Sequence, residues 1–147
     1  MAKAASNNNV AQIGLVLLRV VTGLIFIMHG LQKFNQGIPN TVEGFRSMGV
    51  FAPELMGPFI AGLELFGGIA LILGLLTRPI SVLLVANMIG AAFLVHVEQG
   101  FFAATGGYEY VLALGAMAGT LALTGAGKFS LDGAVFGRNK RLRAVLA

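Results

Sequence analysis

The chain has 147 residues, of which 56% are hydrophobic and only 11% are charged, and its formal net charge is +4. A soluble domain carries charges at about a quarter of its positions, because its surface must face water. The composition therefore excludes a disordered chain, a coiled coil and a typical soluble domain, and it favours one domain embedded in a bilayer.

Long apolar blocks follow one another along the chain, over residues 10–30, 56–76, 79–97 and 108–126. Each has about 20 residues, the length that an α-helix needs to cross the hydrocarbon core. The blocks are continuous and do not alternate with polar residues, which excludes the strands of a membrane barrel. The sequence therefore predicts an all-α, integral membrane four-helix bundle over residues 10–126. A polar tail (1–9) precedes it, and a basic tail (127–147) follows it.

The breaks between the blocks define the connections. The short turn at Thr77-Arg78-Pro79 makes the second and third helices antiparallel neighbours. The first connection is the longest, and its residues 41–48 predict a short helix at the membrane interface.

The distribution of Lys and Arg predicts the orientation. With four spans, both termini share one side with the Arg78 turn, and that side holds seven basic residues: Lys3, Arg78, Lys128, Arg138, Lys140, Arg141 and Arg143. The other side holds two, Lys33 and Arg46. Because the more basic side faces the cytoplasm, we expect both termini to be cytoplasmic. The basic tail is then a contact to anionic lipid and not a nucleic-acid site.

Polar side chains inside the blocks form a candidate intramembrane site: Arg19, Glu64 and Asn87. At 1.5 Å per residue, they lie about 12, 18 and 12 Å from the inner edge, so we expect them to meet inside the bundle. A lone charge at this depth costs at least about 2.5 kcal/mol, so we expect Arg19 to pair with Glu64. Two interpretations stay open, a structural ion pair that holds the helix register and a site for a proton relay or a ligand.

Helical periodicity predicts the contact faces. Arg19, Thr22, Phe26, His29 and Lys33 share one stripe of the first helix. Small residues accompany Glu64 on the second helix (Gly57, Ala61 and Gly68) and follow Glu109 on the fourth helix (Ala113, Ala116, Thr120 and Thr124). Such stripes are the usual contact surfaces between membrane helices.

A second polar cluster is expected at the outer edge: His29, Lys33, His96, Glu98, Tyr108 and Glu109. His96 and Glu98 cannot face one way on a helix, and no established metal-site spacing is present, so we expect a hydrogen-bonded, titratable cluster and no metal site. Such a cluster could lead protons or a quinone headgroup from the outer surface to Glu64. The alternative is that these residues only cap helices and bind interfacial water.

The chain has no cysteine. This excludes disulfides, thiol–disulfide chemistry, cysteine-ligated zinc and iron–sulfur clusters. No motif for haem, flavin, nicotinamide or metal is visible, so the chain does not form a complete oxidoreductase by itself.

Several segments in fixed order resemble the DoxX family of bacterial membrane proteins: Leu17-Leu18-Arg19, Gly23 to Phe26, His29 to Lys33, Gly67 to Arg78, Asn87-Met88, Gly107 to Tyr110 and Gly127 to Asp132. The resemblance covers residues 13–132. It implies a multi-pass four-helix protein of the bacterial inner membrane. The family is named after a small subunit that is associated with a quinone-linked terminal oxidase and thiosulfate oxidation, and some members resemble membrane partners in thiol and superoxide stress defence.

Two classes of function remain open. In the first, the chain is a non-catalytic membrane subunit of a redox, oxidative-stress or quinone-linked system, with redox-enzyme subunits as partners. Arg19, His29 and Glu64 would then bind a quinone carbonyl or move its protons, beside an apolar wall of Phe26, Phe59 and Phe66. In the second, it is a small-solute or proton-conducting protein, or a scaffold without catalysis. Self-association into a homo-oligomer is left open in both.

Overall fold

The computed structural model describes residues 2–136, 142 and 145–146, and this part of the chain is helical and has no strand. The α-helices are α1 (Ala2–Gln36), α2 (Ile38–Ser47), α3 (Pro53–Leu73), α4 (Thr77–Ala91), α5 (Glu109–Thr124) and α6 (Leu131–Phe136). A π-helical turn, η1 (Ala92–His96), continues α4, and two short 3₁₀ turns follow it, η2 (Val97–Gln99) and η3 (Ala103–Thr105). The predicted all-α fold is therefore confirmed.

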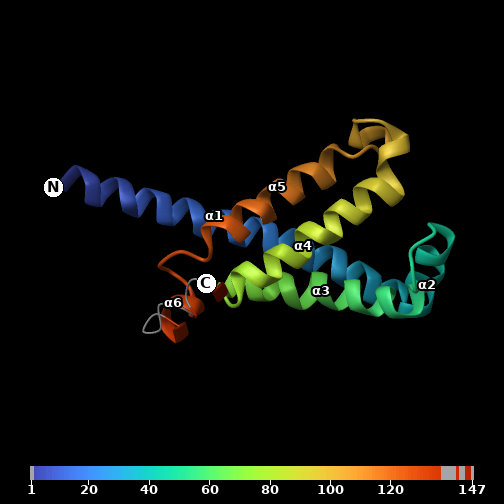
Figure 1. Ribbon diagram of the computed structural model, residues 1–147, viewed down its shortest axis with the longest axis horizontal. Helices are drawn as coiled ribbons and strands as arrows, with labels where there is room; N and C mark the ends of the chain where they lie inside the picture. Colours follow the sequence, from blue (N-terminus) through green and yellow to red (C-terminus); the bar gives the residue numbers. More distant parts are fainter. Residues whose placement is uncertain (1, 137–141, 143–144, 147) are drawn as a thin grey trace.

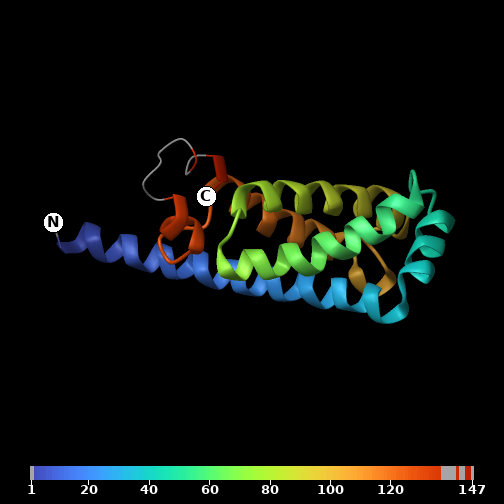
Figure 2. The ribbon, with the colours of Figure 1, turned by 90° about the horizontal axis from the view of Figure 1, so that it is seen from below.

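Four helices run along the long axis of the molecule, α1, α3, α4 and α5 (Figures 1 and 2). The N-terminus, the α3–α4 turn and α6 lie at one end, called here the terminal end. Helix α2 lies across the opposite end, called here the α2 end, where the connection from α4 to α5 also lies. Segments Asn9–Gln36, Pro53–Leu73 and Thr77–Gln99 are long and apolar enough to span a membrane, and α5 is a shorter apolar helix beside them.

The helix bounds differ from the expected ones where local backbone chemistry decides them. Residues 2–9, expected as a polar tail, belong to α1. Helix α3 begins at Pro53 and is ended by Gly74, whose φ of 67° suits a residue without a side chain. Helix α4 already begins at Thr77, so Pro79 lies in its first turn. A proline is tolerated there, because the N–H that it lacks would have no helical partner in the first turn. The expected short helix in the first connection is α2.

The closest helix contact joins α1 to α3 through glycines. A Cβ atom placed on Gly23 would lie 2.5 Å from the carbonyl oxygen of Gly68, and one on Gly68 would lie 2.5 Å from that of Gly23. A Cβ on Gly30 would likewise lie 2.5 Å from the backbone nitrogen of Leu65. The expected small-residue face of α3 is confirmed, because Gly57, Ala61, Glu64 and Gly68 are all buried.

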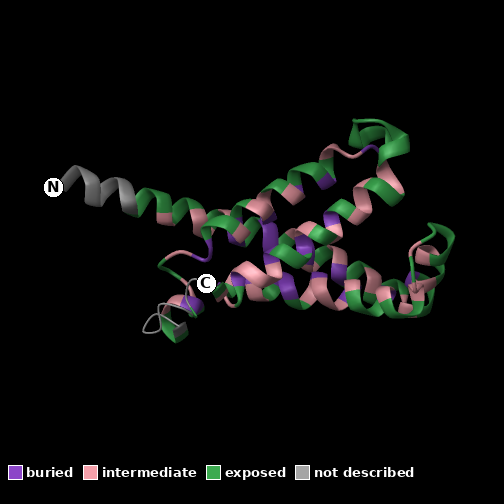
Figure 3. Ribbon diagram, viewed as in Figure 1, coloured by how far each residue is buried: buried purple, intermediate pink, exposed green. Residues whose placement is uncertain are grey.

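The core lies where the four long helices meet, and its buried members are Phe26, Leu71, Leu84, Met88, Val111, Leu114, Ala118 and Leu121. Many large apolar residues are instead exposed on the outside. Figure 3 shows exposed residues along every long helix. Phe93 is 70% exposed and Leu123 is 80% exposed. An outer surface of this kind suits hydrocarbon better than water.

The prediction that small residues form the contact face of the fourth helix is wrong. Ala113, Ala116, Thr120 and Thr124 are exposed on α5. The helix instead buries its larger residues Val111, Leu114, Ala118 and Leu121. Helix α5 packs against α4 through side chains and not through close backbone approach, so its small residues are free to face outward. Of the basic tail, Lys128 is described and exposed, whereas Arg138, Lys140, Arg141 and Arg143 lie outside the described residues.

Candidate functional site

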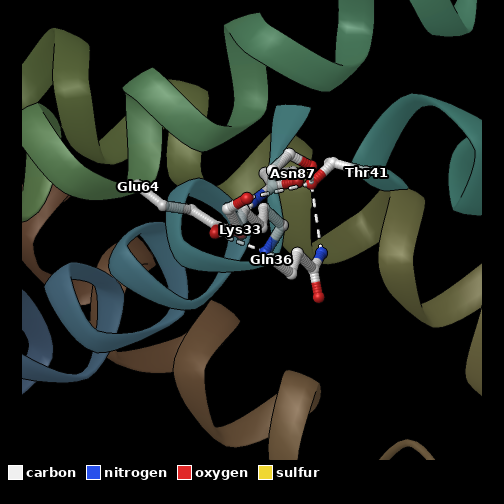
Figure 4. Close-up of polar contacts among 6 residues, drawn as sticks. Lys33, Gln36, Thr41, Glu64 and Asn87 are labelled. Carbon is white, nitrogen blue, oxygen red and sulfur yellow. Dashed lines mark hydrogen bonds and ion pairs between the residues drawn. The ribbon is translucent and has the colours of Figure 1, made fainter. Parts of the chain in front are cut away.

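The central feature of the site is the carboxylate of Glu64, in the middle of α3 and only 4% exposed. Lys33 Nζ of α1 lies 2.5 Å from Glu64 Oε2 and forms a salt bridge with it. Asn87 Nδ2 of α4 donates a hydrogen bond to Glu64 Oε1 over 3.1 Å. Side chains from two helices, α1 and α4, therefore bind the carboxylate of a third, α3, as Figure 4 shows.

Local sequence explains why Lys33 reaches Glu64. The close approach of Gly30 to Leu65 brings α1 against α3 beside the carboxylate. Lys33 follows Gly30 by about one helical turn and lies on the same face. Its flexible side chain then spans the remaining distance, with its aliphatic part along the helix surface. The small residues on α1 and α3 thus position the ion pair.

Polar contacts continue from Lys33 to the α2 end. Thr41 Oγ1 of α2 lies 3.2 Å from the carbonyl oxygen of Lys33 and 3.3 Å from that of Gly37. Gln36 Nε2 donates to the same hydroxyl oxygen over 3.1 Å. Thr41 is only 3% exposed, so these contacts fasten the start of α2 to the end of α1 (Figure 4).

A cavity of about 460 Å³ lies beside the carboxylate, between α3, α4 and the loop that follows α2. Its polar lining consists of Lys33, Glu64 and Asn87. Its other walls are apolar or aromatic: Phe45, Met48, Val50, Phe51, Met56, Phe59, Ile60, Leu63, Leu83, Ala86, Gly90, Ala91, Leu94 and Val95. Few converging polar groups in an apolar cavity are typical of a small-molecule site.

The expected pairing of Arg19 with Glu64 is wrong. Arg19 is 2% exposed, and its two terminal nitrogens donate to the carbonyl oxygens of Ala126 and Phe129 over 2.7 and 2.6 Å. The register explains the difference. Helix α1 extends past the other helices at the terminal end, so Arg19 lies level with Gly74, at the α3–α4 turn. Glu64 lies further along the bundle and is paired by Lys33.

Asp132 completes the arrangement around Arg19 at the terminal end. Its carboxylate accepts hydrogen bonds from the backbone N–H groups of Leu76 and Thr77 over 2.8 and 3.0 Å. Its own N–H donates to the carbonyl oxygen of Gly74 over 2.8 Å. Asp132 therefore caps the start of α4 and ties the segment after α5 to the α3–α4 turn. This part of the molecule is a structural joint, separate from the cavity.

The structure does not gather the six residues of the expected outer cluster. Lys33 lies in the Glu64 site, and the His29 ring lies 6.1 Å from that of Tyr110 in an open groove between α1 and α5. His96 Nδ1 contacts the carbonyl oxygen of Gly106 at 2.6 Å. The remaining three lie in or beside the connection from α4 to α5: Glu98 is exposed, Tyr108 packs edge-on against Phe101, and Glu109 accepts a hydrogen bond from the N–H of Ala103.

Sequence reasoning missed Gln36, Thr41 and Asp132. Thr41 and Asp132 lie outside the predicted membrane spans, in the first connection and the basic tail, where polar residues are ordinary, so their burial has no sequence signal. In the part of the chain that the structure describes, no group of three or more His, Cys, Asp or Glu residues could hold a metal ion.

Comparison with known proteins places the chain among bacterial membrane proteins. The family model named DoxX matches residues 14–97. "Putative oxidoreductase CatD" of Bacillus subtilis is 41% identical over 129 residues, which cover 88% of this chain and 92% of that protein. "Inner membrane protein YphA" and "Inner membrane protein YqjF" of Escherichia coli are 32% and 30% identical, over 80% and 82% of this chain and 87% and 90% of their own lengths. No solved structure matches. The chain therefore belongs to the DoxX family and is a multi-pass protein of the bacterial inner membrane.

Proposed function

We propose that this chain is the membrane subunit of a quinone-linked redox system and that the Glu64 cavity binds the quinone headgroup. The observation that carries the proposal is the hydrogen-bonded carboxylate of Glu64 beside a cavity with otherwise apolar walls. A redox role is also supported by the name of the relative that is 41% identical to this chain, "Putative oxidoreductase CatD".

The chemistry of the lining suits a quinone. The Lys33 ammonium and the Asn87 amide can each donate a hydrogen bond to a carbonyl oxygen, and Glu64 can exchange a proton with a hydroxyl group. The ring and the isoprenoid tail would lie against apolar residues such as Phe59 and Leu94. An ion of either sign is less suited, because Lys33 and Glu64 already neutralise each other.

The proposed reaction assigns protons to this chain and electrons to a partner. Conversion of a quinone to a quinol takes two electrons and two protons. A redox protein that docks on this subunit supplies the electrons, and the Lys33–Glu64 pair passes protons to the quinone oxygens. The chain is then a non-catalytic subunit that binds and orients the acceptor.

The residues that would contact the quinone in this proposal differ from those expected from the sequence. Of the residues expected to contact a quinone, Glu64 and Phe59 line the cavity. Arg19 lies at the terminal end, and His29 lines a different groove. Phe26 is buried in the core and Phe66 is 65% exposed, and neither is among the residues that line the cavity.

Quinone retention tests the proposal. The protein is purified from membranes in a mild detergent, and bound quinones are extracted and quantified. Decylubiquinone binding to the quinone-free protein is then measured. Glu64→Gln is expected to weaken binding about tenfold or more, because it removes the charge that holds Lys33 in the site. Glu109→Gln is the matched control, because Glu109 lies outside the cavity. Equal binding by both variants would contradict the proposal, as would wild-type protein that binds no quinone.

A further inference from the structure

The polar contacts of Glu64 lead toward one end of the bundle only. We propose that Glu64 exchanges protons with water at the α2 end and is closed to protons from the terminal end. This inference deepens the proposed function and rests on it, because a bound quinone is what gives this proton a use.

The open route starts at the salt bridge. The side chain of Glu64 is 5% exposed and that of Lys33 is 18% exposed, so the lysine is the more accessible partner of the salt bridge. Beyond Lys33 lie Thr41 and Gln36, which are joined to each other and to the Lys33 backbone by hydrogen bonds. Gln36 is exposed at the end of α1. These hydrogen bonds end at the main-chain carbonyl of Lys33, and the Lys33 ammonium, which lines the cavity, makes the last contact to Glu64 (Figure 4).

The groups that face Glu64 can support such an exchange. Lys33 is the charged residue in contact with it, and a lysine can release and regain a proton. Helix α4 contributes the uncharged Asn87, and the residues of α2 and η1 that line the cavity are apolar. His29, one turn before Lys33 on α1, lines the separate groove beside Tyr110.

An apolar layer closes the opposite direction. Phe26 of α1, Leu71 of α3 and Leu84 of α4 are 1%, 0% and 0% exposed and belong to one packed cluster. Leu71 follows Glu64 by two helical turns, about 10 Å, and Leu84 precedes Asn87 by about one turn. These side chains offer neither donors nor acceptors, and such a layer excludes water when it is closely packed.

Polar groups reappear only beyond this layer. The hydroxyl groups of Thr22 and Ser81 are buried about one turn nearer to the terminal end than Phe26 and Leu84, and neither has a hydrogen-bond partner among the described residues. Arg19 lies a further turn away, beside Gly74. A guanidinium stays protonated at any ordinary pH, so it cannot pass a proton on. The apolar layer and Arg19 therefore both lie between Glu64 and the terminal end.

The side of proton exchange can be measured without any quinone. Because the chain has no cysteine, one engineered cysteine, Lys128→Cys, allows proteoliposomes to be sorted by the end that faces outward. The protonated carboxyl band of Glu64 is followed by infrared spectroscopy and assigned by its loss in Glu64→Gln. An acid step is applied outside while the interior is buffered. The expected result is a Glu64 signal only when the α2 end faces the acid.

A matched pair of substitutions tests the route. Thr41→Val and Thr22→Val remove the same hydroxyl group at two buried positions, on opposite sides of Glu64. We expect Thr41→Val to slow the appearance of the Glu64 signal several-fold and Thr41→Ser to restore it, since serine keeps the hydroxyl. Thr22→Val is expected to leave the rate unchanged.

The outcomes separate this inference from the proposed function. A Glu64 signal that follows acid at the terminal end, or at neither end, overturns the inference, and so does a greater effect of Thr22→Val than of Thr41→Val. A protein that passes this test but binds no decylubiquinone contradicts the quinone proposal alone. A protein that binds decylubiquinone and fails this test contradicts the sidedness alone.

Discussion

Gly23 and Gly68 face each other across the α1–α3 contact so closely that a Cβ atom on either one would lie 2.5 Å from the carbonyl oxygen of the other. The neighbours are backbone atoms, which cannot move aside without separating the helices. This contact lies between the two polar parts of the molecule, with Arg19 on one side along α1 and Lys33 on the other. The spacing of α1 and α3 therefore affects both the structural joint and the cavity.

The first prediction follows from that contact. Gly68→Ala should destabilise the protein by about 1–3 kcal/mol, because the added methyl group forces overpacking between the helices. Thermal unfolding in detergent, followed by circular dichroism, measures the effect. Gly14→Ala is the control, since a Cβ on Gly14 would meet nothing within 4 Å. It should be neutral or slightly stabilising. Equal melting temperatures for the two variants would show that the α1–α3 contact is looser than described.

The second prediction concerns the partner of Glu64. Glu64→Gln or Lys33→Gln alone leaves a charge without its partner, which typically costs about 3–5 kcal/mol for a buried pair. The double variant should recover part of this loss, with a coupling of about 1–3 kcal/mol. Arg19→Gln combined with Glu64→Gln should show additive effects, since Arg19 bonds to Ala126 and Phe129. Coupling to Arg19 and not to Lys33 would contradict the observed pairing.

The different contacts of Arg19 and Lys33 show what the sequence can and cannot predict. Hydrophobic periodicity correctly predicted that Arg19, Thr22 and Phe26 share a buried face of α1, because burial follows from the 3.6-residue repeat. It could not predict the partner of Arg19, because backbone carbonyl oxygens have no sequence signature. Counting depth from the ends of the apolar blocks also failed, because α1 extends beyond the bundle while α3 does not.

The residues of the candidate site are also only partly predictable from the sequence. Glu64 and Asn87 stood out because polar residues are costly inside apolar blocks. The sequence predicts Lys33 in the outer cluster because it follows the first apolar block, and its long side chain allows either position. The prediction of the contact face of α5 is wrong for a different reason. Small residues can mark a helix contact, but they can equally face lipid, and only the packing of Val111 and Leu114 decides between them.

The third prediction tests the joint at the terminal end. Arg19 donates to two carbonyl oxygens, so a lysine, with one terminal nitrogen, cannot hold both with the same geometry. Arg19→Lys should therefore loosen the segment from Ala126 to Phe129 and increase tryptic cleavage after Lys128, which is exposed. The cleavage rate is measured by mass spectrometry. Arg46→Lys is the control, because Arg46 pairs with Glu43 and Glu54 at the opposite end. Unchanged cleavage in Arg19→Lys would show that the two hydrogen bonds of Arg19 do not hold this segment in place.

The last prediction concerns the orientation in the membrane, which decides from which side of the cell Glu64 would take its protons. In the sequence, the side of the membrane that holds both chain ends and the Arg78 turn has seven basic residues, whereas the other side has two, Lys33 and Arg46. The positive-inside rule therefore predicts a cytoplasmic terminal end. Reporter fusions after Ala147 and in the Arg78 turn should both give inside signals, and a fusion at Gly100 should give an outside signal. An outside signal after Ala147 together with an inside signal at Gly100 would invert the predicted orientation. Protons that enter through the α2 end would then come from the cytoplasm and not from outside the membrane.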